Sequence, residues 1–285
     1  MSSPVRILAL CGYSQNAITF ATSLRGALLQ SPSFDAAAAW KPLSGSFQKF
    51  QLPPSASEQG ERLGTVVSQS KDGRAEFTFL DPPIVLGREH LAPVHVKEYE
   101  KNLKEASDKH HVTPRAWWLA PDRDTYAEYD NSVKYISDFL QTQERPFDGV
   151  IGFSQGAAMT AALTALLEKD GLSPQFTRGS ATPLKFAIAV GGFKPRSKTP
   201  DFSAYFPVNT PVLHVVGAQD PVVSAKASKQ LQDATPTSRA VGHDGGHWTP
   251  GNSQWQKFFS DFIASMGKGG KLGDTAAPGE ESARL

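Results

Sequence analysis

The second half of the chain alternates between short apolar runs and helical patterns, and this alternation constrains the fold more than any other feature. Parallel strands need long crossover connections, which are usually helices, so the alternation predicts a mostly parallel sheet covered by helices on both faces. The fold class is therefore α/β. The apolar runs lie at 147–153, 186–191, 212–216 and 239–242, and the helical patterns lie at 155–168, 222–234 and 254–266.

The first half adds one strand–loop–helix unit and one hairpin. Arg6–Leu10 predicts a short buried strand, and a helical pattern follows from about Asn16 to Leu29. Strands are also expected at 65–70 and 74–80, because they flank Lys71-Asp72-Gly73, a typical turn sequence.

Composition indicates a globular domain with a separate tail. Residues 1–266 form one expected domain, and the polar stretch 42–74 is interpreted as an insertion or hairpin within it. A further helix is expected at 126–143, whereas 87–114 has no firm assignment. From 267 to 285 the sequence has almost no apolar content, which predicts a disordered tail.

The charge balance excludes several classes of partner. The chain carries 29 basic and 28 acidic residues, a net charge of +1, so no strong field attracts nucleic acid or anionic lipid. No stretch approaches the roughly 18 apolar residues that span a bilayer. The single cysteine, Cys11, allows no intrachain disulfide and fits a reducing compartment. We therefore expect a cytoplasmic protein without a membrane span or a nucleic-acid partner.

The segment Gly152-Phe153-Ser154-Gln155-Gly156 is a G-x-S-x-G motif in an informative context. It follows an apolar strand and opens a helix of small residues, which is what a nucleophile elbow requires. In such a turn the residues two before and two after the serine must be almost free of side chain. The turn would lift the Ser154 hydroxyl above the sheet, at a helix N-terminus that favours developing negative charge.

A serine hydroxyl needs a base, and the base needs a group to orient it. Asp220 follows the strand 212–216, so it would lie on the same edge of the sheet as Ser154. The chain order of serine, acid and histidine also matches this type of enzyme. The alternative is that Asp220 only caps the helix that follows.

Two histidines compete for the role of general base, His243 and His247. Both lie in the loop between the last short strand and the last helix. His247 follows two glycines that would let the loop fold back over the sheet, so we assign it as the base. His243 stands at the strand end and is interpreted as an anchor of the loop.

The oxyanion of a tetrahedral intermediate needs two backbone donors. We assign one to the N–H of Gln155, which follows the nucleophile, and the other to the N–H of Tyr13, in the loop after the first strand. The alternative for this loop is that Gly12 only makes a turn. Cys11 is interpreted as a small hydrophobic residue at a strand end rather than a catalytic thiol.

Other chemistry-bearing residues have weaker patterns. Trp117, Trp118 and Trp248 could line an acyl pocket, but aromatic core residues would have the same pattern. Asp148 precedes the nucleophile strand and so lies at the wrong end of the sheet to orient a histidine. The sequence has no zinc-ligand spacing, no Walker loop and no G-x-G-x-x-G motif, so we expect no metal and no cofactor.

The same segments resemble the FSH1-type serine hydrolase family over roughly residues 5–265. This resemblance implies an α/β-hydrolase fold, hydrolysis of carboxylic esters or thioesters without a cofactor, and a cytoplasmic or nuclear location. Matched residue by residue, the family's catalytic positions fall on Ser154, Asp220 and His247. The chain departs from the family at Cys11, where relatives often have histidine, and in the long stretch 42–74. The matching segments are 12–16, 147–158, 216–223 and 243–250.

Three functions remain open from the sequence. The first is an esterase that acts on small-molecule esters through an acyl-serine intermediate. The second, suggested by the resemblance, is a thioesterase that releases a polyketide or other acyl chain from an acyl-carrier domain of a synthase. The third is a binding module that keeps the fold without catalysis, although such a module would not need all three of Ser154, Asp220 and His247.

Overall fold

A central sheet organises the protein. The computed structural model describes residues 3–29, 34–43, 47, 62–108, 111–122 and 124–279, with positions 94, 95 and 98 described by their backbone alone. The sheet strands are β1 (Val5–Leu10), β2 (Trp40–Pro42), β3 (Gly64–Gln69), β4 (Ala75–Leu80), β7 (Gly149–Phe153), β8 (Phe186–Val190), β9 (Val212–Gly217) and β10 (Ser238–His243).

The strand order of this eight-stranded sheet is β10-β9-β8-β7-β1-β4-β3-β2. From β10 to β4 every neighbouring pair is parallel, and only β3 and β2 join by antiparallel pairing. The predicted mostly parallel sheet is confirmed. Because β1 lies between β4 and β7, the loops that follow β1 and β7 meet at the same edge of the sheet.

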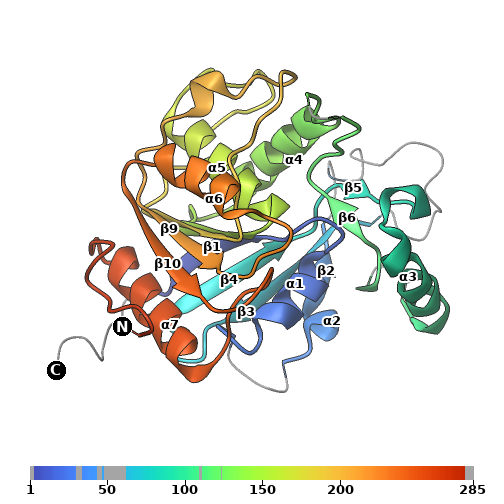
Figure 1. The fold of residues 1–285 in the computed structure, drawn as a ribbon, viewed down its shortest axis with the longest axis horizontal. Coiled ribbons are helices and arrows are strands. Elements are labelled where there is room, and N and C mark those ends of the chain that lie inside the picture. Colours follow the sequence, from blue (N-terminus) through green and yellow to red (C-terminus); the bar gives the residue numbers. More distant parts are fainter. Residues whose placement is uncertain are drawn as a thin grey trace.

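Helices cover both faces of the sheet (Figure 1). Successive side chains of β1 point to opposite faces: Leu8 and Leu10 pack in one apolar cluster, while Ile7 and Ala9 pack in the other. The first cluster lies under α4, α5 and α6, and the second lies over α1, α2 and α7. The helices are α1 (Ala17–Leu24), α2 (Ala36–Ala39), α3 (Pro93–Glu105), α4 (Tyr129–Gln141), α5 (Gln155–Glu168), α6 (Ala225–Asp233) and α7 (Ser253–Gly267).

The predicted hairpin belongs to the central sheet. Its strands β3 and β4 pair in antiparallel register, and β4 continues the parallel part by pairing with β1. The strand residues within the stretch 42–74 therefore belong to the central sheet. Most of its polar part, 44–46 and 48–61, lies outside the described residues.

A smaller two-stranded sheet and α3 occupy the region that had no firm assignment. The strands β5 (Ile84–Val85) and β6 (Arg115–Ala116) pair in antiparallel register. The short 3-10 helices are η2 (Arg88–His90), before α3, and η4 (Ser203–Tyr205), between β8 and β9. Pro93 is the first residue of α3, a position that proline favours, but the helix has few apolar residues. Across the described part of the chain, no helix combines the length and apolar character needed to cross a bilayer.

Two helices begin later than predicted because the residue before each first turn has a non-helical backbone. The helix expected at 126–143 starts at Tyr129, since Glu128 before it adopts the left-handed conformation, with a φ of 65°. The helix expected at 222–234 starts at Ala225, after an N-cap at Ser224.

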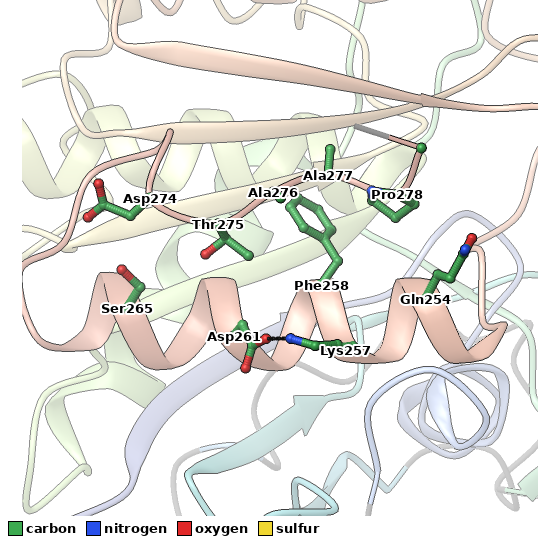
Figure 2. Close-up of a pocket in the computed structure, with 11 residues that line it drawn as sticks. Gln254, Lys257, Phe258, Asp261, Ser265, Asp274, Thr275, Ala276, Ala277 and Pro278 are labelled. Carbon is green, nitrogen blue, oxygen red and sulfur yellow. Dashed lines mark hydrogen bonds and ion pairs between the residues drawn. The ribbon is translucent and has the colours of Figure 1, made fainter. Parts of the chain in front are cut away.

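The prediction of a disordered tail is wrong for residues 268–279. The Arg239 guanidinium of β10 donates to the carbonyls of Leu272 and Thr275, at 2.9 and 2.6 Å. Ala277 is buried in the apolar cluster beneath the sheet. Figure 2 shows Phe258 of α7 pointing toward this segment, beside a pocket of about 510 Å³. Backbone carbonyls, Ala277 and the partly buried Leu272 hold the segment, so its low apolar content did not reveal the packing.

Candidate active site

Ser154 occupies a strained turn between β7 and α5. Its φ of 53° and ψ of −118° lie in a region that residues with a Cβ rarely adopt. The Ser154 N–H donates to the carbonyl of Val190 at the end of β8, at 2.9 Å. Strain of this kind costs free energy and persists only when the surrounding structure enforces it, and it is common at functional sites.

The glycines of the motif are required by close backbone contacts. A Cβ atom on Gly152 would stand 2.2 Å from the carbonyl oxygen of Gly156, and a Cβ on Gly156 would stand 2.0 Å from the carbonyl oxygen of Leu10. Both distances are far below van der Waals contact. The predicted sharp turn from strand to helix is thus present, and it rests on the packing of α5 against β1.

Asp220 lies in the turn after β9 and uses both carboxylate oxygens. Oδ1 accepts the N–H groups of Val222 and Val223, both at 2.8 Å, and Oδ2 lies 2.7 Å from Nδ1 of His247. The N-cap of α6 is Ser224, so the alternative that Asp220 caps this helix is wrong. Asp220 instead shapes its own turn and contacts the imidazole.

The electrostatics of this pair favour an ionised carboxylate. Burial raises the pKa of Asp220, but hydrogen bonds from Val223, His247 and Val222 outweigh it, so the pKa lies below its ordinary value. The carboxylate side chain is only 4% exposed and the imidazole 15%. Because a carboxylate can only accept, Nδ1 of His247 donates to it, and in a neutral imidazole with that proton Nε2 is the acceptor.

The loop that carries His247 is bonded to the loop that carries Asp220. The Ala218 N–H donates to the carbonyl of His243 at 2.8 Å, and the Gln219 N–H donates to that of Gly245 at 3.0 Å. A Cβ on Gly217 would stand 2.3 Å from the carbonyl oxygen of Gly246, so the two loops touch along their backbones. The glycines before His247 do let the loop fold back over the sheet edge.

The imidazole of His247 lies beside the nucleophile turn. Its ring centroid is 4.7 Å from that of Phe153, the residue before Ser154. Two of its ring atoms lie 3.1 Å from where a Cβ on Gly191 would stand, and Gly191 follows the residue that accepts the Ser154 N–H. Gly191, with a φ of 55°, was missed as a site residue, although two adjacent glycines at a strand end are a usable signal.

His243 braces the same loop without contacting the carboxylate of Asp220. Its Nδ1 accepts the Gly245 N–H at 3.2 Å, and its ring lies between those of Trp248 and Trp255. Burial lowers its pKa, which favours the neutral ring that this acceptor role requires. These contacts fit the predicted anchor.

The loop after β1 lies directly against Ser154. A Cβ on Gly12 would stand 3.0 Å from the Phe153 ring and 3.2 Å from Cβ of Ser154, so this glycine permits a close approach as well as a turn. The next residue is Tyr13, whose N–H is one predicted oxyanion donor. The other belongs to Gln155, the first residue of α5, where N–H groups lack partners within the helix. The assignment of both donors stays a prediction.

The three tryptophans of the predicted acyl pocket lie in different environments. Trp117 and Trp118 are buried, with Trp118 stacked on Tyr126 at a centroid distance of 4.8 Å. Trp248 is 56% exposed and packs over the glycines before His247. Their role in acyl binding stays a prediction.

Other titratable candidates have structural surroundings. Cys11 is fully buried, and burial raises the pKa of its thiol well above the ordinary value, so it is no thiolate nucleophile. His214 is buried in β9 against the hydroxyl of Thr235, and burial lowers its pKa to about 4. Asp148, at the opposite end of the sheet, accepts the Arg6 N–H and pairs with Lys185.

Comparisons with known proteins agree with this architecture. Esterase PE8 has a TM-score of 0.51 and 17% identity, covering 93% of this chain and 94% of that protein. Arabidopsis thaliana SOBER1 has a TM-score of 0.50 and 16% identity, covering 93% and 99%. At these identities the likeness shows the fold alone, and it confirms the expected α/β-hydrolase fold.

Sequence relatives identify the family. Mouse Esterase OVCA2 is 33% identical over 219 residues, covering 73% of this chain and 90% of the mouse protein. A Schizosaccharomyces pombe protein named Dihydrofolate reductase is 31% identical over 194 residues, 67% of this chain but only 41% of that protein. This chain therefore spans about two fifths of that relative. The family described as Serine hydrolase (FSH1) matches residues 54–259, and the chain belongs to this family.

Proposed function

We propose that this protein hydrolyses carboxylic esters or thioesters through an acyl-serine intermediate. Ser154 is the nucleophile, His247 the general base, and Asp220 the acid that orients the base. The single observation that carries the proposal is the 2.7 Å contact between His247 and Asp220, next to a strained serine turn. The family assignment supports the same chemistry.

The first chemical step is attack by Ser154 on the acyl carbonyl. Nε2 of His247 takes the hydroxyl proton, and the resulting imidazolium is stabilised by the carboxylate of Asp220. The alcohol or thiol leaves with that proton, so the acyl group remains on Ser154. Water activated by His247 then releases the acid. All groups in these steps come from the chain, the substrate and water.

The negative charge on the substrate oxygen needs donors that are already in place. The N–H groups of Tyr13 and Gln155 would supply them, from the loop after β1 and from the N-terminus of α5. The helix dipole of α5 adds to this stabilisation because its positive end faces the same position.

An oxoester and a thioester pass through the same acyl-serine intermediate, so one mechanism covers both. The name Esterase OVCA2 of the mouse relative favours small-molecule esters as the first substrates to test. An acyl chain presented by a carrier domain stays a prediction from the sequence resemblance.

The test combines a covalent probe with hydrolysis of acyl esters and acyl thioesters of increasing chain length. Wild-type protein should react with a fluorophosphonate at one serine and hydrolyse part of the panel, whereas Ser154→Ala should lose both reactions while keeping its circular dichroism spectrum. Ser203→Ala, at an exposed position of η4, is the matched control and should keep both. A wild-type protein that neither labels nor hydrolyses any member would favour the binding-module alternative.

A further inference from the structure

The two N–H groups assigned to the oxyanion come from segments that are far apart in the sequence, and a third segment is bonded to both. We propose that the side chains of Gln155 and Trp117 are positioning residues that fix the separation of the Tyr13 and Gln155 N–H groups. They do so by tying the loop after β1 and the start of α5 to residues 115–118. The inference rests on the proposed function.

The side chain of Gln155 binds this segment through both of its polar atoms. Its Oε1 accepts the Trp117 N–H and its Nε2 donates to the Trp118 carbonyl, each at 2.9 Å. The residue is 6% exposed, so water does not compete for these bonds. A residue expected to contribute its backbone N–H to catalysis thus has its side chain bonded to a separate part of the chain.

The loop after β1 is bonded to the same segment from the other side. The Ser14 N–H donates to the carbonyl of Arg115, and the indole Nε1 of Trp117 donates to the carbonyl of Cys11, both at 2.9 Å. These bonds lie on either side of Tyr13 along the chain. Asn16, at the end of the loop, donates through Nδ2 to the carbonyl of Thr113 at 3.0 Å.

The segment is itself immobilised in the core. Trp117 is fully buried, and its carbonyl accepts the hydroxyl of Ser132 on α4 at 2.5 Å. Trp118 is stacked on Tyr126, with 14° between the ring planes. A preorganised oxyanion site needs both N–H donors to be held by a rigid part of the structure. Donors that must rearrange during the reaction stabilise the oxyanion less.

This arrangement predicts a specific kinetic signature. Gln155→Met keeps the length of the side chain and the backbone N–H but removes both hydrogen bonds to 117 and 118. Misplaced donors weaken stabilisation of the transition state more than binding of the ground state. Removing a whole oxyanion donor typically costs roughly 10²- to 10³-fold in kcat, so we expect a fall of roughly tenfold to a hundredfold, with KM little changed.

The experiment measures kcat and KM for the best ester of the panel, and the affinity for a trifluoromethyl ketone that forms a tetrahedral adduct with the serine. In Gln155→Met the affinity for the ketone should fall by about the same factor as kcat/KM. Gln141→Met is the matched control, because the hydrogen bonds of its amide to other described residues stay within α4, at Ser137, and both quantities should stay at wild-type values.

If Gln155→Met does not fold, Trp117→Phe tests the bond between residues 115–118 and the loop after β1. It removes the donor to Cys11 and keeps most of the buried volume, so we expect a smaller fall in kcat, again with KM little changed. A folded Gln155→Met or Trp117→Phe with wild-type kcat, or with a raised KM alone, would overturn the inference. A wild-type protein without hydrolysis or labelling would instead overturn the proposed function, and this inference with it.

Discussion

The nucleophile turn and the acid–base loops lie side by side but are built in different ways. The turn is one contiguous segment, Gly152–Gly156, whose shape follows from backbone contacts that exclude any Cβ at its two glycines. The acid–base pair joins residues 27 positions apart through hydrogen bonds between two loops. The geometry of the turn therefore depends mainly on steric exclusion, whereas that of the acid–base pair depends mainly on hydrogen bonds and charge.

This difference predicts how each region fails. A change of volume should displace the nucleophile and the start of α5 together, because Gly156 packs on the backbone of β1. A change that keeps the backbone acceptors, such as Asp220→Asn, should leave both loops in place and alter only the proton chemistry, whereas removal of an acceptor should also cost stability. Substitutions of each kind therefore separate geometry from charge.

Removing the base should cause the largest loss of rate. His247→Ala should reduce kcat by on the order of 10⁴- to 10⁶-fold, because nothing else near Ser154 is assigned to take its proton. His243→Ala is the matched comparison in the same loop. It should mainly lower stability, by about 1–3 kcal/mol, because the Gly245 N–H loses its acceptor. Steady-state kinetics and thermal melts on both variants check this, and the reverse order of rate losses would mean that the base is His243.

Asp220→Asn should be the next most damaging change and should spare the fold. The amide oxygen can still accept the N–H groups of Val222 and Val223, but the amide NH₂ would face Nδ1 and stabilise the wrong tautomer. By analogy with other triads, kcat should fall about 10⁴-fold.

Asp220→Ala provides the structural counterpart. It should lose a similar amount of rate and, in addition, about 1 kcal/mol of stability, because the turn loses its acceptor. Urea denaturation of both variants measures that difference. Near-wild-type turnover in a folded Asp220→Asn would mean that another carboxylate is the acid, with Asp244 the next candidate.

The turn should respond to volume rather than charge. Gly156→Ala adds a methyl group 2.0 Å from the carbonyl oxygen of Leu10, so β1 and α5 must separate. Displacements near 1 Å can cost roughly 100-fold in rate, and overpacking of this kind costs about 3 kcal/mol or more. The kcat and the Tm of this variant should therefore both fall. A Gly156→Ala protein with wild-type stability and reduced rate would contradict the steric account of the turn.

Truncation should have the smallest effect on rate. Deleting 268–285 removes the carbonyl partners of Arg239, which supports the strand before the His247 loop. We expect a loss of about 1–3 kcal/mol, a fall of several degrees in Tm, and less than a threefold change in kcat. Deleting only 280–285 keeps these contacts and is the control. An unchanged Tm in the longer deletion would show that the tail contributes nothing to the fold.

The sequence predicted the parts of the site whose signals are local. The strand β7, the turn at Ser154 and the start of α5 follow from five residues and their apolar flanks. The loops after β9 and β10 were recognised because glycines follow each strand and polar side chains stand at the sheet edge. The contact between Asp220 and His247 was then expected from chain order and from the placement of both residues in loops after strand ends.

The parts that the sequence did not reveal depend on contacts between distant segments. Nothing near Gln155 indicates that its amide binds the backbone at 117 and 118, because main-chain donors and acceptors have no sequence signature. The tail at 268–279 was missed for the same reason, since Arg239 binds its carbonyls. The helix α3 was missed because most of its residues are polar or charged, so few apolar positions mark a buried face.

The central claim is that Ser154 and His247 act as one unit, and a double-mutant cycle tests it most directly. The residual hydrolysis rates of Ser154→Ala, His247→Ala and the double variant are measured against buffer with the same ester. Residues that act as a unit are strongly non-additive, so the double variant should retain the rate of either single variant within about threefold. Losses that multiply in the double variant would show that the two residues act independently and would contradict the account.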